Sequence, residues 1–233
     1  TAMDNVKIVL PDPPFFDTTR LEGLRSKNVD ITIYRDLPLD ATQLQERIIE
    51  ADIIVVDLLS TYNEASLGKC QQLRHIVTAT VGTNHIDKEY CESRGIEIHN
   101  FKNYNSRAVA EMSFANLIAL LRHIPLAVQT VRANLWATDY FIGEELKSKT
   151  LGIIGAGNIG KELIAIGKGF GMNVICNTKN PTSERAKSLG LEKFSTLEEV
   201  LSNSDFVMLS AVTTKETENL INEKTLALMR PTS

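Results

Sequence analysis

Residues 155–160 read Gly-Ala-Gly-Asn-Ile-Gly, which is the GxGxxG spacing of a phosphate-binding turn. Glycines let the chain turn tightly and approach a phosphate closely, and a helix start adds N–H donors and a favourable dipole. The segment follows a predicted strand at 150–154 and begins a predicted helix at 158–170, which favours a pyrophosphate-binding turn over an ordinary strand-to-helix turn. The residues expected to contact a dinucleotide are Gly155, Gly157, Asn158, Ile159 and Gly160.

The end of the next predicted strand indicates which dinucleotide is preferred. An NAD site usually carries an acidic residue there, about 20 residues beyond the first glycine, for the ribose 2′-hydroxyl. Here the segment contains Thr178 and Lys179 and no acid. A lysine can pair with a 2′-phosphate, so we predict a preference for NADP, with NAD possible. The alternative is that both residues belong to a solvated turn.

The four histidines give no pattern of a proton relay. His75 lies beside the start of a predicted strand, where packing is expected, and His99 ends another strand. His85 is expected to be an exposed turn residue, and His123 ends a predicted helix, where a cation complements the helix dipole. None has an acidic partner at a spacing that marks a relay. We therefore assign no catalytic residue and no metal ligand from the sequence.

Composition excludes several other classes of function. The 233 residues carry a formal net charge of −4, which gives no basic surface for nucleic acid. No apolar run reaches the roughly 18 residues of a membrane helix, so no membrane partner is expected. The three cysteines, Cys70, Cys91 and Cys176, are too widely spaced for a disulfide framework or a metal knuckle. We expect a reduced, cytoplasmic setting.

Apolar strands alternate with amphipathic helices, which predicts an α/β fold with parallel sheets. Strands are predicted at 6–10, 30–34, 52–56, 74–78, 96–99, 150–154, 173–176, 191–194 and 205–209. Helices are predicted at 18–27, 40–50, 88–94, 105–122, 158–170, 182–188, 196–202 and 222–229. The pattern predicts two Rossmann-like or flavodoxin-like domains, 1–100 and 101–233, with an excursion at 124–149.

The second domain is expected to be incomplete at its C-terminus. It supplies about four predicted strands, whereas a full dinucleotide-binding fold has roughly six. The sequence ends at Ser233, where a further strand would begin.

Several segments together resemble the D-isomer-specific 2-hydroxyacid dehydrogenases. The stretch 143–160, which contains the glycine turn, is the most specific, and the turn at 81–87, Val-Gly-Thr-Asn-His-Ile-Asp, is similar to the family's substrate-anchoring turn. The other matching segments are 105–111, 205–207, 214–217, 220–222 and 226–231. The resemblance covers nearly all of the chain.

The resemblance implies roles for residues in both domains. Backbone N–H groups at Val81 and Gly82 would bind the carboxylate of a small 2-keto or 2-hydroxy acid, although the segment could also be an ordinary turn. Leu59, with its neighbours Leu58 and Ser60, would line the same site, or the two leucines would belong to the core. On the cofactor side, Ala211 and Val212 would pass beneath the dinucleotide and Thr217 would follow them. Residues 210–212 depart from the family's usual His-aliphatic-Pro pattern.

The resemblance also implies a reaction and an assembly. The reaction is hydride transfer between a nicotinamide and C2 of the acid, and the family's catalytic Arg, Glu and His would lie beyond this sequence. The alternatives are a non-catalytic, dinucleotide-sensing scaffold similar to corepressors, or an inactive truncated member. Residues 124–149, hereafter the arm, would form a homodimer through Trp136, Tyr140 and Phe141, or pack on their own subunit.

Overall fold

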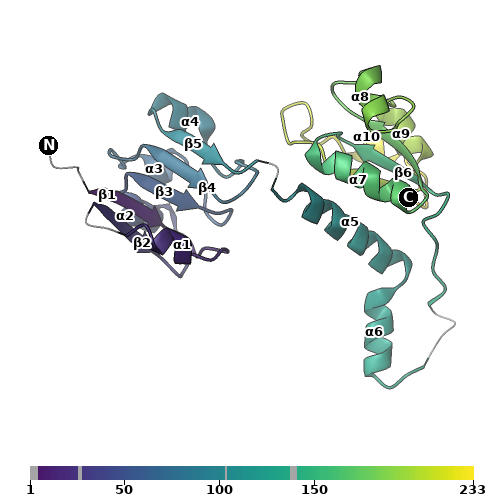
Figure 1. Cartoon of the computed structure of the whole chain (residues 1–233), viewed down its shortest axis with the longest axis horizontal. Helices are drawn as coiled ribbons and strands as arrows, with labels where there is room; N and C mark the ends of the chain where they lie inside the picture. Colours follow the sequence, from purple (N-terminus) through teal and green to yellow (C-terminus); the bar gives the residue numbers. More distant parts are fainter. Residues whose placement is uncertain (1–4, 26–27, 103, 137–140) are drawn as a thin grey trace. The chain divides into compact units, whose positions relative to one another are not determined.

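The computed structural model describes residues 5–25, 28–102, 104–136 and 141–233. The chain divides into two compact units, Thr1–Tyr104 and Asn105–Ser233 (Figure 1). The sequence predicts this division near residue 100. Each unit has its own parallel sheet and its own core, as the alternation of strands and helices predicts.

The first unit is built on a five-stranded parallel sheet in the order β2-β1-β3-β4-β5. This is the flavodoxin-like order, in which the strand order reverses at the β1/β3 pair. The strands are β1 Val6–Leu10, β2 Val29–Ile33, β3 Ile53–Val56, β4 His75–Thr78 and β5 Glu97–Asn100. The helices are α1 Thr19–Glu22, α2 Ala41–Ile48, α3 Glu64–Leu67 and α4 Lys88–Ser93.

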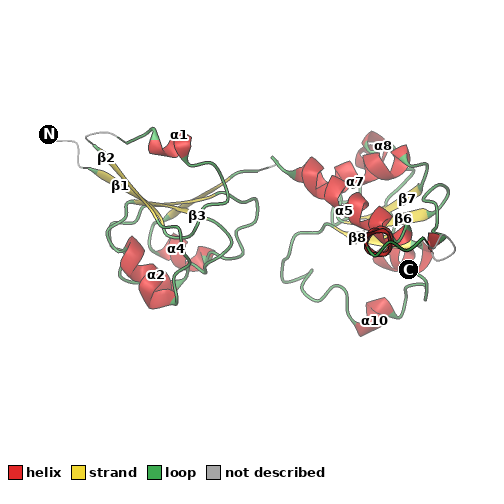
Figure 2. Ribbon diagram, turned by 90° about the horizontal axis from the view of Figure 1, so that it is seen from below, coloured by secondary structure: helices red, strands yellow, loops and turns green. Residues whose placement is uncertain are grey.

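The two faces of this sheet are covered differently. Ile54 and Ile76 point to the face that packs against α2, α3 and α4, and both are fully buried. Their neighbours in sequence point to the other face, because side chains alternate along a strand. There, α1 covers the part of the sheet formed by β1, β2 and β3 through Leu21. Figure 2 shows α1 on one side of the sheet and α2 and α4 on the other.

The second unit contains a three-stranded parallel sheet in the order β7-β6-β8. Helix α7 packs against β6 and β7 on one face and against α5, which runs alongside it (Figure 1). The strands are β6 Thr150–Ile154, β7 Asn173–Asn177 and β8 Phe206–Leu209. The helices are α5 Ser106–Leu121, α6 Ile124–Arg132, α7 Asn158–Gly169, α8 Ser183–Ser188, α9 Leu197–Asn203 and α10 Glu223–Leu226.

An aspartate before a strand joins neighbouring strands in both units. The Asp52 carboxylate, before β3, accepts a hydrogen bond of 2.8 Å from the N–H of Lys7 in β1. The Asp205 carboxylate, before β8, accepts one of 2.7 Å from the N–H of Thr150 in β6. Each bond lies at the pair of strands where the order reverses, and it joins the starts of those two strands.

Some predicted elements were wrong in type or length. The predicted strand at 191–194 is not a strand: only the N–H of Ser195 pairs with β7, at 2.8 Å to the Cys176 carbonyl. The capping box of α9 begins at the next residue, Thr196, and leaves no length for a ladder. Among the described residues of the helix predicted at 18–27, only α1 is helical, and the helix predicted at 222–229 is confined to α10. The helix α3 was not predicted.

Helices α5 and α6 are joined at a sharp bend. Their axes differ by 61°, and His123 at the break has a left-handed backbone with φ of 51°. Among the described residues, no single helix is long and apolar enough to cross a membrane. Taken as a pair, α5 and α6 reach the necessary length and composition, but only with this bend between them.

Candidate functional site

The three glycines of the turn after β6 have three different steric roles. Gly155 has φ of +104°, and a Cβ there would lie 2.7 Å from the backbone nitrogen of Ala211. A Cβ at Gly160 would lie 2.0 Å from the carbonyl oxygen of Gly155, so this glycine lets α7 pack against the turn. A Cβ at Gly157 would meet nothing within 4 Å. Space for a ligand is therefore left at Gly157, the residue directly before α7.

A pocket of about 430 Å³ lies over this turn. Its walls are the turn itself, the end of β7 and the segment after β8. Seven of the predicted cofactor residues line it: Gly155, Gly157, Thr178, Lys179, Ala211, Val212 and Thr217. In Rossmann folds the dinucleotide binds in a pocket of this kind, at the carboxyl ends of the strands where the order reverses.

The remaining predicted residues do not line the pocket. Gly160 is buried in the packing of α7 against the turn, and Ile159 packs against the core of the unit. Asn158 is exposed at the first position of α7. These three residues therefore shape the start of the helix, while the pocket wall is formed by the residues around them.

The side chain of Arg185, which the sequence did not reveal as a site residue, reaches the end of β7. The guanidinium of Arg185 donates to the carbonyl of Ala156 at 2.5 Å, to the hydroxyl of Thr178 at 3.4 Å and to the carbonyl of Asn180 at 3.2 Å. It comes from α8, so no sequence spacing from the glycines identifies it. The guanidinium therefore lies between the glycine turn, at Ala156, and Thr178, which is part of the predicted site for a 2′-phosphate.

Lys179 has a competing acidic neighbour. Its ammonium lies 3.7 Å from the carboxylate of Glu216, and both side chains are mostly exposed. The hydroxyl of Thr214 donates to Glu216 at 2.7 Å, and this bond, more than Lys179, holds the pKa of the carboxyl below its ordinary range. The acid is therefore charged at neutral pH and partly neutralises Lys179.

Hydroxyl groups hold the segment after β8 in place. The Ser210 hydroxyl donates to the Gly155 carbonyl at 2.8 Å. The Thr217 hydroxyl donates to the Val212 carbonyl at 2.6 Å and accepts from the N–H of Thr214 at 2.7 Å. Val212 itself is 77% exposed. At residues 210–212, where the sequence departs from the family pattern, Ser210 therefore binds the segment to the glycine turn.

In the first unit, the predicted carboxylate-binding turn follows β4. Two side chains fix its carbonyl groups: the amide of Asn100 donates to the Val81 carbonyl at 2.7 Å, and the hydroxyl of Thr80 donates to the Gly82 carbonyl at 2.7 Å. Within the described part of the chain, no hydrogen bond occupies the N–H groups of Val81 and Gly82. The turn therefore presents N–H donors at an exposed position.

Leu59 follows β3 near the same end of the sheet and is 40% exposed. The next residue, Ser60, donates to the carboxylate of Asp12 at 2.5 Å, and the Tyr62 hydroxyl donates to its other oxygen at 2.6 Å. Asp12 is 3% exposed and was not identified from the sequence. Burial, followed by the charge of Asp12, raises the pKa of Tyr62, which stays a hydrogen-bond donor. This network ties the loop after β3 to the end of β1.

His85 is not the exposed turn residue that we predicted. It is half-buried, its ring lies edge-on to Tyr62, and its Nδ1 atom is buried with no hydrogen-bond partner among the described residues. Burial lowers the pKa of this imidazole. The ring is therefore neutral near pH 7 and contributes packing beneath the turn.

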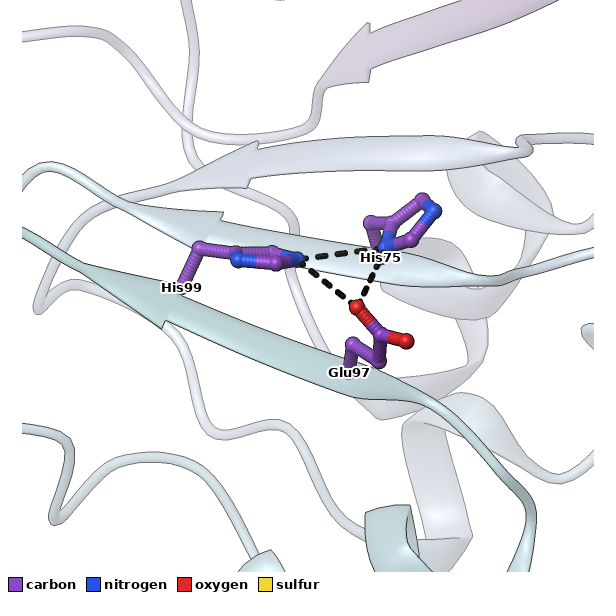
Figure 3. Close-up of side chains that lie close together, drawn as sticks. All are labelled: His75, Glu97 and His99. Carbon is purple, nitrogen blue, oxygen red and sulfur yellow. Dashed lines mark hydrogen bonds and ion pairs between the residues drawn. The ribbon is translucent and has the colours of Figure 1, made fainter.

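Two of the histidines have an acidic partner that the sequence spacing does not mark. His75 and His99 lie beside each other with Glu97 between them (Figure 3). Parallel pairing of β4 with β5 brings the three side chains together, and the sequence spacing alone does not reveal that pairing.

Both units are open parallel α/β sheets with polar groups at the carboxyl ends of their strands, and one carries a dinucleotide turn. This combination is typical of the class of α/β proteins that bind a nucleotide at the carboxyl ends of parallel strands. A family model described as D-isomer specific 2-hydroxyacid dehydrogenase, NAD binding domain, matches residues 114–233. The chain belongs to this family, as the resemblance in its sequence predicts.

Related proteins agree with this assignment. The chain is 35% identical over 206 residues to a glyoxylate reductase of Pyrococcus furiosus, covering 85% of this chain and 60% of that protein. It is similar to an acyclic imino acid reductase, Bsp5, solved with NADPH and D-Arg (28% identity, TM-score 0.84, 97% and 72% coverage). It is also similar to a D-lactate dehydrogenase of Aquifex aeolicus solved with NAD and lactic acid (28% identity, TM-score 0.81, 96% and 66% coverage).

Proposed function

We propose that this chain provides the acid-binding and nucleotide-binding parts of an NAD(P)-dependent 2-hydroxyacid dehydrogenase that reduces a small 2-keto acid. The observation that carries the proposal is the steric difference between the three glycines: two are closed by the fold, and Gly157 alone leaves room for a ligand. The relatives named glyoxylate reductase and D-lactate dehydrogenase support the reaction class. The chain spans 60% of the length of that glyoxylate reductase.

The residues of the second unit would bind and orient the dinucleotide. The N–H groups at the start of α7 would face the pyrophosphate, and the segment held by Ser210 and Thr217 would form the opposite wall. When bound, the nicotinamide group supplies or accepts the hydride. The chain's contribution here is orientation and electrostatic stabilisation.

The residues of the first unit would bind the acid. The free N–H groups of Val81 and Gly82 are suited to a carboxylate, because oriented backbone donors form a site for anions. Asn100 would keep the Gly82 N–H oriented when no acid is bound, because the Val81 carbonyl that it holds belongs to the same peptide group. Thr80 holds the following peptide group of the turn through the Gly82 carbonyl. Leu59 would supply an apolar wall for the acid's short carbon chain.

We further propose that NADP is preferred over NAD. Thr178, Lys179 and Arg185 surround the end of β7 with one hydroxyl and two cations, and no carboxylate stands at the usual ribose position. Charge-assisted hydrogen bonds from arginine and lysine favour a phosphate. The similar structures include complexes with NADPH and with NAD, so the preference depends on these residues.

Titration of the chain with each dinucleotide tests both parts of the proposal. Quenching of protein fluorescence, or calorimetry, should report one site per chain, with NADPH binding at least about tenfold more tightly than NADH, which corresponds to about 1.4 kcal/mol. Equal affinity would remove the NADP preference. Absence of binding to either nucleotide would remove the proposed function.

We also propose that the arm forms a homodimer. Its described part presents apolar side chains to solvent along α6 and the residues after it, and Trp136 is 86% exposed. Tyr140 lies outside the described residues, and Phe141 is half-buried. An exposed tryptophan among exposed aliphatic side chains is typical of a protein interface. Sedimentation of the wild type should give a dimer, and Trp136→Ala should shift the distribution toward monomer.

A further inference from the structure

The sheet of the first unit brings two imidazoles and a carboxylate together on one face. In the parallel pairing of β4 with β5, His75 is opposite Glu97 and Val77 is opposite His99. Glu97 and His99 are two residues apart, so both point to the same face as His75. Figure 3 shows the three side chains turned toward one another above these strands. This is the face opposite the one packed against α2, α3 and α4.

We propose that His75, Glu97 and His99 bind a zinc ion. The facing donor atoms form a nearly equilateral triangle. Nδ1 of His75 lies 3.2 Å from Nε2 of His99, and the Oε2 atom of Glu97 lies 3.6 Å from the first and 3.5 Å from the second. In a tetrahedral zinc site with bonds of about 2.0–2.2 Å, the donor atoms lie about 3.3–3.6 Å apart.

The donor set selects the metal. Two imidazoles and one carboxylate suit zinc and its neighbours in the first transition series, whereas magnesium and calcium prefer oxygen ligands. An octahedral magnesium ion with bonds of about 2.1 Å would also need neighbouring donors only about 3.0 Å apart. Both the chemistry of the donors and the size of the triangle therefore favour a tetrahedral transition metal.

The metal-free arrangement already holds the rings near their ligating positions. With one proton between them, the two imidazoles can share a hydrogen bond at 3.2 Å. To bind zinc, each neutral ring must carry its proton on the nitrogen that faces away, which is Nε2 of His75 and Nδ1 of His99. The change is a shift of tautomer, and Glu97 supplies one negative charge against the two charges of the ion.

The site is open to solvent and has one position left for a further ligand. The side chains of His75, His99 and Glu97 are 39%, 51% and 66% exposed, so an ion can enter without opening the core. Three protein ligands plus a water molecule or an external donor are a common zinc coordination. Because β5 is the last strand of this sheet, a bound ion would also cross-link the edge strand to β4.

Metal titration of the whole chain tests this site directly. After treatment with a chelator, the wild type should bind one equivalent of Zn²⁺ in calorimetry, and Co²⁺ should give the visible absorption of a tetrahedral ion. Zinc should also raise the temperature of thermal unfolding, because a ligand that binds the native state stabilises it. The proposal does not depend on the dinucleotide, so NADPH binding is measured as an independent readout.

Four variants separate this site from other zinc-binding groups. Three of them each remove one ligand: His75→Gln, His99→Gln and Glu97→Gln. Loss of a residue that only supports a ligand weakens metal affinity by about 10- to 100-fold. Loss of a ligand itself should weaken zinc affinity by more than that. His123→Asn is the control, because it removes a histidine outside the cluster and asparagine tolerates the left-handed backbone there. It should bind zinc as the wild type does.

Three outcomes would overturn the proposal. They are no zinc binding by the wild type, zinc affinity in all three cluster variants equal to that of the wild type, or loss of zinc binding in His123→Asn alone. Circular dichroism and thermal unfolding in the absence of zinc show whether each variant is folded. An octahedral Co²⁺ spectrum would also contradict the tetrahedral arrangement.

Discussion

The side-chain amide of Asn100, the last residue of β5, donates a hydrogen bond of 2.7 Å to the carbonyl oxygen of Val81 in the turn after β4. The edge strand of the sheet thereby fixes one peptide of the turn that we propose to bind a carboxylate. Thr80 fixes the next peptide through the carbonyl of Gly82. Asn100 thus orients the N–H of Gly82, because it holds the carbonyl end of the same peptide group.

Asn100→Ala should weaken binding of a 2-keto acid without unfolding the protein. Loss of one hydrogen bond frees the peptide between Val81 and Gly82, and the expected cost is about 1 kcal/mol, or about fivefold in affinity. The measurement is an NMR titration with glyoxylate in the presence of NADPH, following the amide signals of Val81 and Gly82. Asn84→Ala is the matched control, since the described structure shows no side-chain hydrogen bond for this exposed asparagine of the same turn. If both variants bind glyoxylate as the wild type does, Asn100 has no positioning role.

Alanine at two glycines of the dinucleotide turn should have opposite consequences. Gly157→Ala adds a methyl group where nothing lies within 4 Å, so the protein should fold normally but bind NADPH at least about tenfold more weakly. Gly160→Ala places a carbon 2.0 Å from the Gly155 carbonyl oxygen, which should cost about 3 kcal/mol of stability or more. Urea unfolding and NADPH titration of both variants separate the two effects. A stable Gly160→Ala variant that binds NADPH normally would contradict the assigned packing.

Arg185→Gln should reduce the affinity for NADPH more than that for NADH, because the guanidinium is one of two cations near the proposed 2′-phosphate. We expect a change of about tenfold or more in the ratio of the two dissociation constants, as for loss of a charge-assisted hydrogen bond. Lys187→Gln, which removes an exposed cation from the same helix, should leave the ratio unchanged. A parallel loss of both affinities would mean that Arg185 acts only by supporting the Ala156 carbonyl.

Glu216→Gln should have the opposite effect on NADPH. The carboxylate lies 3.7 Å from Lys179 and competes with a phosphate for it. Both groups are well exposed, so the gain in NADPH affinity should be only severalfold and should decrease at high salt. Titrations with NADPH at two salt concentrations measure it. Unchanged affinity at low salt would show that Lys179 does not contact the 2′-phosphate.

The parts of this fold that the sequence predicted are those set by local pattern. The strand Thr150–Ile154 and the glycine turn after it lie where periodicity and glycine spacing place them, because both signals are contained in a few consecutive residues. The segment 191–194 was misassigned because its apolar residues fill the core without forming a ladder, which depends on a distant strand. A few consecutive residues show that a segment is apolar, but they do not show whether it pairs with another strand.

The site residues that the sequence did not reveal all act across long separations. Arg185 reaches the turn from a later helix, and Asp12 accepts hydrogen bonds from Ser60 and Tyr62, about 50 residues away. His75 meets His99 only through the register of β4 with β5. Each contact requires the tertiary fold, and no motif of fixed spacing encodes it.

Asp205→Asn should destabilise the second unit in a way that depends on pH. The carboxylate accepts from the N–H of Thr150 at 2.7 Å and from the guanidinium of Arg230 at 2.6 Å, and the backbone bond is the main cause that holds its pKa below the ordinary 3.8. A carboxyl whose pKa is lowered by folding stabilises the native state above its unfolded pKa and loses that contribution as pH falls through its folded pKa. The variant should therefore be less stable than the wild type by about 1–2 kcal/mol at pH 7. The difference should narrow below pH 3.8, as the wild-type carboxyl takes up its proton.

Urea unfolding of both proteins between pH 7 and pH 3 measures this difference in stability, with Glu192→Gln as a control at an exposed acid. A destabilisation that is the same at every pH would mean that the shape of the side chain, and not its charge, joins β8 to β6.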